Sequence, residues 1–212
     1  MAVDRQQVVQ WIQAYAAAIR ENRDYLTQLD AAIGDADHGA NMDRGFQAVL
    51  GKLPTVADKD IGAILKTVGM TLVSTVGGAG GPLYGTLFMQ AGQAEAGKTE
   101  MTDQDVVALF EAALKGVIVR GKAEPGDKTM VDTLTPAVNA LKEAVDGGAP
   151  LDEALKQAMT AAEEGMKGTI PLVARKGRAS YLGERSANHR DPGCQSTMLI
   201  LRAAAETAAG QG

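Results

Sequence analysis

Amphipathic helices account for almost every long segment of this chain. Apolar residues recur three or four positions apart and so share one helical face. This pattern runs over residues 8–19, 61–76, 106–117, 131–145 and 151–166. Further helices are predicted near residues 41–51, 82–95 and 195–208, and no segment alternates convincingly as a strand does. Short loops favour antiparallel neighbours, so the sequence predicts one all-α domain over residues 1–212, a bundle or barrel of about eight helices.

Local signals support the predicted helix boundaries. Thr102 and Asp105 have the spacing of a capping box, with Asp in place of the usual Glu. Pro82 suits the first turn of a helix, because the N–H that it lacks would have no partner there. Pro136 lies inside an apolar stripe, so we expect a kink or a later helix start at that point.

Charge and cysteine content narrow the functional classes. The formal net charge is −5 and the basic residues are scattered, so nucleic acid is not an expected partner. The single cysteine, Cys194, excludes an internal disulfide and suits a reducing cytoplasm. The N-terminal segment lacks the order of a signal peptide, and no apolar run approaches the length of a membrane span. We therefore expect a cytoplasmic protein that does not bind membranes.

Four connections are not plain turns. They are residues 30–41, 77–82, 121–130 and 174–195, and they follow the first, third, fifth and seventh predicted helices. In an up-and-down bundle, alternate connections lie at the same end, so these four are expected to gather there. The last is long for a helix connection, and such loops are usually lids or binding loops. Topology alone therefore predicts a site at one end of the molecule.

Three aspartates lie close together in the first of these loops. Asp35 and Asp37 are two positions apart, so they point the same way in an extended segment, and Asp30 closes the preceding helix nearby. Oxygen ligands without cysteine or clustered histidine suit Mg²⁺, Mn²⁺ or Ca²⁺ rather than zinc, and few protein ligands leave positions for water and phosphates, as Mg²⁺ prefers. The competing interpretation is helix capping and turn formation.

Two other loops carry groups that suit phosphate. The glycines of "GGAGGP", residues 77–82, let backbone N–H groups approach an anion at a helix N-terminus, although a flexible turn explains them equally. No Lys-Ser or Lys-Thr follows, so this is not a Walker A motif. An arginine in the 174–195 loop would clamp phosphates, while most of its basic residues read as solvated charges. These are Arg175, Lys176, Arg178, Arg185 and Arg190.

These loops together predict a magnesium-dependent nucleotide site at one end of a helical barrel. The aspartates would hold metal, the glycine amides would hold phosphates, and the arginine loop would close over them. Met130 either covers an adenine ring or belongs to the core.

Four long segments carry a resemblance to a known family: GDADHGANMDRGF, TVGGAGGPLYGTLF, GKAEPGDKTMVD and ARKGRASYLGERSANHRDPG. In their order and spacing, the chain resembles the L subunits of dihydroxyacetone kinases, the nucleotide-binding components. The resemblance covers almost the whole sequence. It implies an eight-helix antiparallel up-and-down barrel with ADP or ATP bound at one end. It also implies two Mg²⁺ ions held by Asp30, Asp35 and Asp37.

The resemblance implies nucleotide contacts in every loop. Arg178 matches a lid residue directed at the phosphates, and we expect it to act in catalysis. The other expected contacts are His38, Asn41, Met42, Ala79, Gly80, Gly121, Met130, Asp191 and Gly193. Many relatives have serine at the position of Gly80, so a hydroxyl contact to phosphate is lost here. Cys194 stands where a small alanine is usual, and we expect little effect.

The implied activity is transfer of a γ-phosphoryl group to dihydroxyacetone, which a separate K subunit holds on a histidine. This agrees with the lack of a convincing general base in the sequence, since phosphoryl transfer mainly requires positioning and charge stabilisation. An L chain alone favours the phosphotransferase-system version, in which an M-type phosphohistidine protein rephosphorylates bound ADP. Three alternatives stay open: a free-ATP kinase subunit for a related ketose such as erythrulose, a nucleotide-state regulator that binds a transcription factor, and a bundle with a structural metal.

Overall fold

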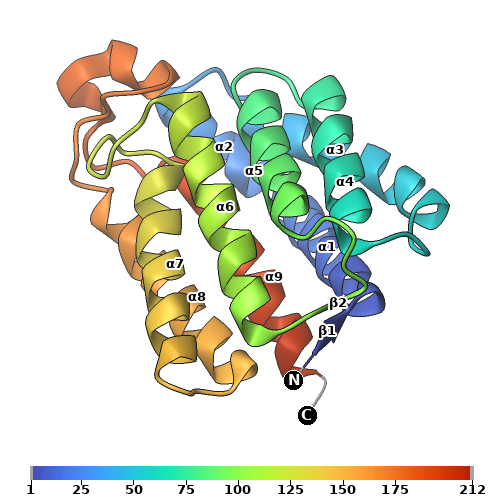
Figure 1. Cartoon of the computed structure of the whole chain (residues 1–212). Coiled ribbons are helices and arrows are strands. Elements are labelled where there is room, and N and C mark those ends of the chain that lie inside the picture. Colours follow the sequence, from blue (N-terminus) through green and yellow to red (C-terminus); the bar gives the residue numbers. More distant parts are fainter. Residues whose placement is uncertain (1, 211–212) are drawn as a thin grey trace.

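A computed structural model describes residues 2–210, which are almost entirely helical (Figure 1). The α-helices are α1 (Arg5–Glu21), α2 (Arg23–Ile33), α3 (His38–Lys52), α4 (Ile61–Thr75), α5 (Gly80–Ala94), α6 (Asp103–Gly121), α7 (Met130–Asp146), α8 (Leu151–Gly168) and α9 (Pro192–Ala209). Two 3₁₀ segments, η1 (Leu53–Thr55) and η2 (Arg178–Ser186), lie in connections. Two short strands, β1 (Val3–Asp4) before α1 and β2 (Glu100–Met101) between α5 and α6, pair in antiparallel fashion.

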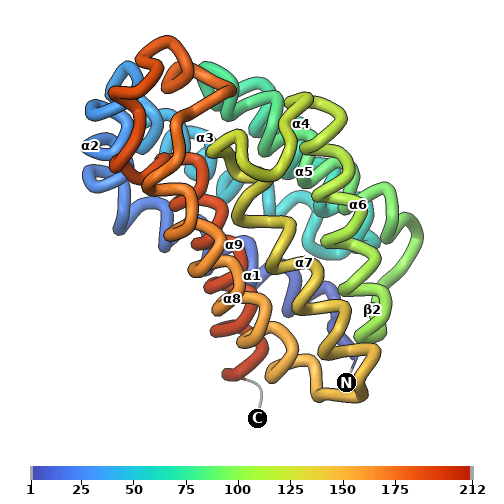
Figure 2. The backbone as a smooth tube through the Cα atoms, turned by 90° about the vertical axis from the view of Figure 1, so that its left-hand side faces the viewer, coloured from blue at the N-terminus to red at the C-terminus, as the bar shows by residue number. Residues whose placement is uncertain are grey.

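The helices form a closed antiparallel ring, which confirms the predicted all-α barrel. Consecutive helices from α3 to α9 pack against one another, and α1 closes the ring between α9 and α3. The extra helix, α2, arises because Asn22 interrupts the predicted first helix, and it packs over α3 and α9. Figure 2 shows the neighbouring helices α7, α8 and α9 side by side along the barrel.

The predicted boundaries hold with small shifts. Thr102 and Asp105 form the expected capping box at the start of α6. Pro136 lies inside α7 and does not delay the start of that helix. Gly165 of α8 packs against the helical turn that ends at Pro136. A β-carbon at Gly165 would lie 2.4 Å from the carbonyl oxygen of Asp132, which Pro136 leaves without its helical partner. The strand pair was not predicted, because two residues are too few to show alternation.

Aromatic side chains fill the middle of the barrel. Tyr15 meets Phe46 edge-on with ring centroids 4.7 Å apart, and Trp11 lies within about 6 Å of both Phe88 and Phe110. These rings come from α1, α3, α5 and α6, so the core ties opposite walls together. The rigid barrel can therefore hold loops at its rim in fixed positions.

Glycines bring α4 and α5 into backbone contact. A β-carbon at Gly69 would lie 2.6 Å from the carbonyl oxygen of Gly85, and one at Gly92 would lie 2.7 Å from that of Gly62. Only glycine allows so close an approach. The short connection between these two helices is consequently held tightly against the barrel.

The four predicted loops gather at one end of the barrel. In Figure 1 the connections α2–α3, α4–α5, α6–α7 and α8–α9 all lie at the top, and β1 and the end of α9 lie at the bottom. This agrees with the topological prediction. Among the described residues, no helix combines the length and apolar character that crossing a membrane requires.

Candidate functional site

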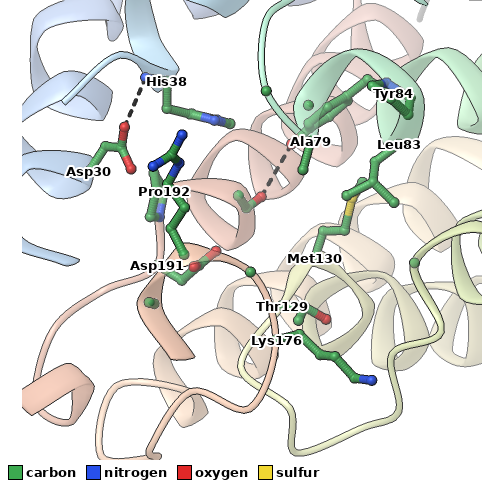
Figure 3. A pocket seen from close by; sticks show the side chains of 18 of the residues that line it. Asp30, His38, Ala79, Leu83, Tyr84, Thr129, Met130, Lys176, Asp191 and Pro192 are labelled. Carbon is green, nitrogen blue, oxygen red and sulfur yellow. Dashed lines mark hydrogen bonds between the residues drawn. The ribbon is translucent and has the colours of Figure 1, made fainter. Parts of the chain in front are cut away.

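A cavity of about 540 Å³ opens among the four loops. Its wall takes residues from the α2–α3 loop, the α4–α5 turn, the α6–α7 loop and the α8–α9 loop, together with the helix ends beside them. Figure 3 shows Asp30 and His38 on one side of this cavity and Met130 and Thr129 on the other. The arrangement thus has a polar side and an apolar side.

Three carboxylates form the polar side. An oxygen of each of Asp30, Asp35 and Asp37 lies within 4.8 Å of the others. Asp30 is almost buried, and its Oδ2 accepts the N–H groups of Asp37 (2.8 Å) and His38 (3.1 Å). Ala36 takes a left-handed backbone conformation (φ 61°), which turns the chain between the two exposed aspartates.

The capping interpretation applies to only one of these aspartates. Asp37 occupies the N-cap position of α3, yet its side chain makes no capping hydrogen bond. Asp30 instead reaches from α2 to the first N–H groups of α3. Asp35 and Asp37 therefore keep exposed carboxylates beside the cavity, which is the donor set that a hard divalent cation prefers.

Arg178 forms an ion pair with this cluster. Its guanidinium lies 2.9 Å from the Oδ2 of Asp35, and two thirds of its side chain is exposed. Gly177 precedes it with φ 66°, a conformation that brings η2 back towards α2. Of the five basic residues predicted in this loop, only Lys176 and Arg178 line the cavity. Arg190 instead donates to Tyr25 and Gln195.

The glycine turn presents main-chain N–H groups to the cavity. Ala79 is the N-cap of α5, and Gly80 and Gly81 begin the helix, so their N–H groups have no partner within it. Gly77 packs on Asn41: a β-carbon there would lie 3.0 Å from the amide nitrogen. Arg44 donates to the Oδ1 of Asn41 (2.7 Å) and fixes that side chain at the rim. Positive helix-end charge and free donors make an anion site.

The opposite wall is apolar. Leu83, Val117, Gly121, Ala123 and Met130 line it, and Met130 is almost fully buried at the start of α7. A capping box of Thr129 with Asp132 fixes that helix start. Met130 thus belongs both to the core and to the cavity wall, so the two interpretations of it are compatible. An apolar slot of this kind suits the face of a flat ring.

A buried hydroxyl network lies beneath the polar side. The Ser196 hydroxyl is 2.8 Å from Nε2 of His38 and 2.6 Å from the hydroxyl of Tyr84. Burial lowers the pKa of His38 and raises that of Tyr84 above its usual range. These shifts favour neutral side chains that orient one another, so the network provides a fixed floor.

The N-terminus of α9 closes the base of the cavity. Asp191 caps this helix by accepting the N–H of Cys194 (2.9 Å), and burial raises the pKa of Asp191 to about 6. Gly193 lies beside it, and its carbonyl accepts from Tyr84 (3.2 Å). Cys194 is fully buried, and its thiol donates to the carbonyl of Thr129 (3.0 Å), as a packing residue would.

Twelve of the predicted site residues line this one cavity, and one does not. They are Asp30, Asp35, Asp37, His38, Asn41, Ala79, Gly80, Gly121, Met130, Arg178, Asp191 and Gly193. Met42 has no exposed surface and packs in the barrel core, where its sulfur would lie 3.9 Å from a β-carbon at Gly80. Its place on the inner face of α3 explains this, because the first turn of the helix alone meets the cavity.

Sequence reasoning missed several wall residues. Tyr84 and Leu83 sit in the first turns of α5, where they read as ordinary core positions. Lys128 reads as a surface charge in a polar loop, yet it is 1% exposed. Apolar residues at helical spacing do not indicate which lysine of a loop is buried, so the burial of Lys128 is seen only in the structure.

Comparisons with known proteins identify the family of this chain. Residues 32–206 match the DAK2 domain family. The ADP-binding subunit DhaL of a PEP-dependent dihydroxyacetone kinase from Escherichia coli is 49% identical, over 95% of this chain and 96% of that protein. The ADP-binding subunit DhaL of a PTS-dependent dihydroxyacetone kinase from Lactococcus lactis is 40% identical, over 95% and 96%.

A solved structure is also similar. The dihydroxyacetone kinase from C. freundii in complex with AMP-PNP and Mg²⁺ superposes with a TM-score of 0.72 at 27% identity, over 94% of this chain and 33% of that longer chain. With a family match over most of its length and a 49% identical relative of nearly equal extent, the chain belongs to the DAK2 domain family.

Proposed function

We propose that this chain is the ADP- and ATP-binding subunit of a phosphoenolpyruvate-dependent dihydroxyacetone kinase. The observation that carries the proposal is the carboxylate cluster, which faces a glycine turn and an apolar slot across one cavity. Relatives at 40% and 49% identity, matched over nearly their whole length, bear the names of such subunits. The chain would act as a single nucleotide-binding domain.

The cavity offers a place for each part of a nucleotide. The adenine ring fits the apolar slot beside Met130 and Gly121, and the phosphates extend towards Ala79 and Gly80 at the start of α5. Asp30, Asp35 and Asp37 would hold two Mg²⁺ ions beside the phosphates. When bound, these ions would neutralise phosphate charge and fix the orientation of the transferred group.

The chain's own residues supply the remaining stabilisation. Arg178 lies at the mouth of the cavity, where its guanidinium can bond to phosphate oxygens in a bidentate manner. The N–H groups that begin α5 point at the same region and require no reorganisation during transfer. His38 is held by Ser196 and would orient rather than exchange protons. Asn41, fixed by Arg44, would complete the phosphate rim.

The cavity residues suit phosphoryl transfer better than acid–base chemistry. The neutral side chains of the floor are buried and bonded to one another, so none of them is a free base. The acceptor, dihydroxyacetone, would therefore be held and activated by a separate K subunit. A phosphohistidine protein of the M type would rephosphorylate the bound ADP. This chain would then act in the cytoplasm together with these partners.

The experiment that tests this proposal measures the nucleotide carried by the purified protein. After gel filtration in Mg²⁺ and denaturation, ion-exchange chromatography should find about one ADP per chain, as a retained cofactor requires. Empty protein that binds and exchanges ATP would favour the free-ATP kinase subunit. Failure to bind any adenine nucleotide would refute the proposal, and retention of a DNA-binding protein without a K subunit would favour the regulator.

A variant pair assigns the binding to the cluster. Asp35→Asn removes one exposed carboxylate without disturbing a main-chain hydrogen bond, so the protein should fold normally and lose Mg²⁺-dependent ADP binding and transfer. Asp24→Asn changes an exposed aspartate of α2, the helix before the loop that carries Asp35; Asp24 does not line the cavity, and this variant should bind like the wild type. Full activity of Asp35→Asn would show that the metal ligands lie elsewhere.

A further inference from the structure

One lysine in the α6–α7 loop is buried without a carboxylate among its hydrogen-bond acceptors. Four main-chain carbonyl oxygens share the three N–H groups of the Lys128 Nζ, those of Thr169 (3.0 Å), Ile170 (2.9 Å), Leu172 (3.1 Å) and His189 (2.7 Å). Its side chain is 1% exposed, and burial lowers its pKa, with the charge of Asp191 opposing that shift. Burying a cation costs free energy, and the hydrogen bonds to these carbonyls offset that cost.

The four carbonyls belong to the two stems of the 169–191 loop. Three of them follow the last residue of α8, the helix end that carries partial negative charge. The fourth, from His189, stands just before the N-cap of α9. The two stems also bond directly, because the N–H of Asn188 donates to the carbonyl of Ile170 (2.7 Å). A single ammonium group therefore joins the beginning and the end of the loop.

The same lysine connects this loop to the cavity. The main-chain carbonyl of its neighbour Asp127 accepts the N–H of Arg175 (3.1 Å), and Arg175 lies three residues before Arg178. On its other side, Thr129 and Met130 line the cavity. Lys128 itself adopts a left-handed backbone conformation (φ 63°), uncommon for a residue with a side chain. The loop backbone is thus bent to deliver this ammonium to its carbonyl cage.

We infer that Lys128 is a positioning residue that acts as a tethered monovalent cation and sets the closed position of the Arg178 loop. Oxygen cages built from main-chain carbonyls are the ligands that K⁺ takes in place of water, and an ammonium group has a similar size and the same charge. The cage would therefore accept K⁺ or NH₄⁺ when the lysine side chain is removed. Its effect on nucleotide retention rests on the function proposed above, whereas its effect on the loop does not.

The test compares three variants by hydrogen–deuterium exchange of nucleotide-free protein. Lys128→Ala opens the cage, and Lys128→Met fills it with an uncharged stem. Lys122→Met is the matched control, because Lys122 is an exposed lysine in the same loop, also with positive φ (50°). Each is measured in LiCl, NaCl, KCl and NH₄Cl at equal ionic strength. The readout is residues 170–190, which contain the hydrogen-bonded amides of Ala174, Arg175 and Asn188.

In NaCl, both Lys128 variants should exchange at residues 170–190 faster than the wild type by about tenfold or more, since charge-assisted hydrogen bonds are lost. K⁺ and NH₄⁺ should restore protection in Lys128→Ala but not in Lys128→Met, whose thioether occupies the cage. Helix α6 should stay protected throughout, and Lys122→Met should match the wild type. Release of ADP from the loaded protein should follow the same order of variants and ions.

Several results would overturn the inference. One is unchanged protection of residues 170–190 in Lys128→Ala. Another is a loss of protection that no cation reverses, or that every cation reverses. A third is an equal loss of protection in α6, which would indicate general destabilisation. If Lys128→Ala folds only in KCl or NH₄Cl, the inference is supported. If Lys128→Ala folds in none of the salts while Lys128→Met keeps normal protection, the inference is refuted. If the wild type holds no ADP while Lys128→Ala still shows the ion-selective loop effect, the proposed function alone would be refuted.

Discussion

Asp30 should contribute to the fold through two hydrogen bonds that can be separated from its charge. A single oxygen, Oδ2, accepts the N–H groups of Asp37 and His38 and so joins α2 to the start of α3. Asp30→Asn keeps an oxygen in that place and removes the charge. Asp30→Ala removes both. The difference in unfolding free energy between the two variants therefore isolates the hydrogen bonds.

The magnitude follows from the geometry. Each bond is of normal length (2.8 and 3.1 Å), and the loss of each costs about 1 kcal/mol, so Asp30→Ala should be less stable than Asp30→Asn by about 2 kcal/mol. In both variants, removing the charge relieves repulsion from Asp35 and Asp37, whose oxygens lie within 4.8 Å, and this cancels in the comparison. A chain of this size converts that difference to roughly 4–8 °C in the melting midpoint.

The assay is urea and thermal unfolding of the metal-free and nucleotide-free proteins, followed by titration with Mg²⁺ and ADP. Both variants should lose Mg²⁺-dependent binding, because each lacks one carboxylate of the cluster. Equal stabilities of Asp30→Asn and Asp30→Ala would refute the reasoning, since Asp30 would then not support the loop. Wild-type ADP binding by Asp30→Asn would instead remove Asp30 from the metal ligands.

Three further variants test other parts of the site. Arg178→Ala should slow transfer to the K-bound ketose by about 10²–10³-fold, as loss of one charge-stabilising donor does, and wild-type rates with saturating partners would exclude a role at the phosphates. Gly80→Ser places a β-carbon 3.1 Å from Cγ1 of Val76 and a hydroxyl at the start of α5, so calorimetry should find ADP bound roughly tenfold more tightly. An unchanged affinity would mean that the backbone N–H suffices. Because burial raises the pKa of Asp191 from 3.8 to about 6, its stabilising contribution is full below about pH 4 and is lost as the pH rises through 6. Asp191→Asn, which keeps a capping oxygen, should therefore flatten the dependence of unfolding free energy on pH between 4 and 7, and superimposable curves for both proteins would contradict the shift.

The fold could be predicted from sequence because its determinants are local. Apolar residues at helical spacing, the Thr102–Asp105 capping box and the order of the loops suffice to place the helices and to bring four loops to one end. The break at Asn22 could not be predicted, because its N–H and side-chain amide both bond to the carbonyl of Ala18 and end α1 within a continuous helical pattern.

The site could be predicted only where residue type and chemistry correspond closely. Aspartates beside glycines point to metal and phosphate, so Asp30, Asp35 and Asp37 stood out. The orientation of a helical side chain depends on the neighbours of its helix, and this hid the core position of Met42. Lys128 was hidden for a different reason: its partners are main-chain carbonyls from residues 41 to 61 positions away, which no local pattern records.

The ion pair of Arg178 with Asp35 links the 174–195 loop to the carboxylate cluster. Three carboxylates within 4.8 Å of one another repel, and Arg178 offsets part of that charge while it holds the loop near the cavity. A phosphate offers the same guanidinium a second acceptor of equal or greater charge, and Arg178 would then exchange a carboxylate partner for a phosphate partner. That exchange would free Asp35 for the metal ions proposed beside the phosphates. Nucleotide entry, metal ligation and loop position would therefore be coupled through one side chain, with Lys128 fixing the base from which Arg178 moves.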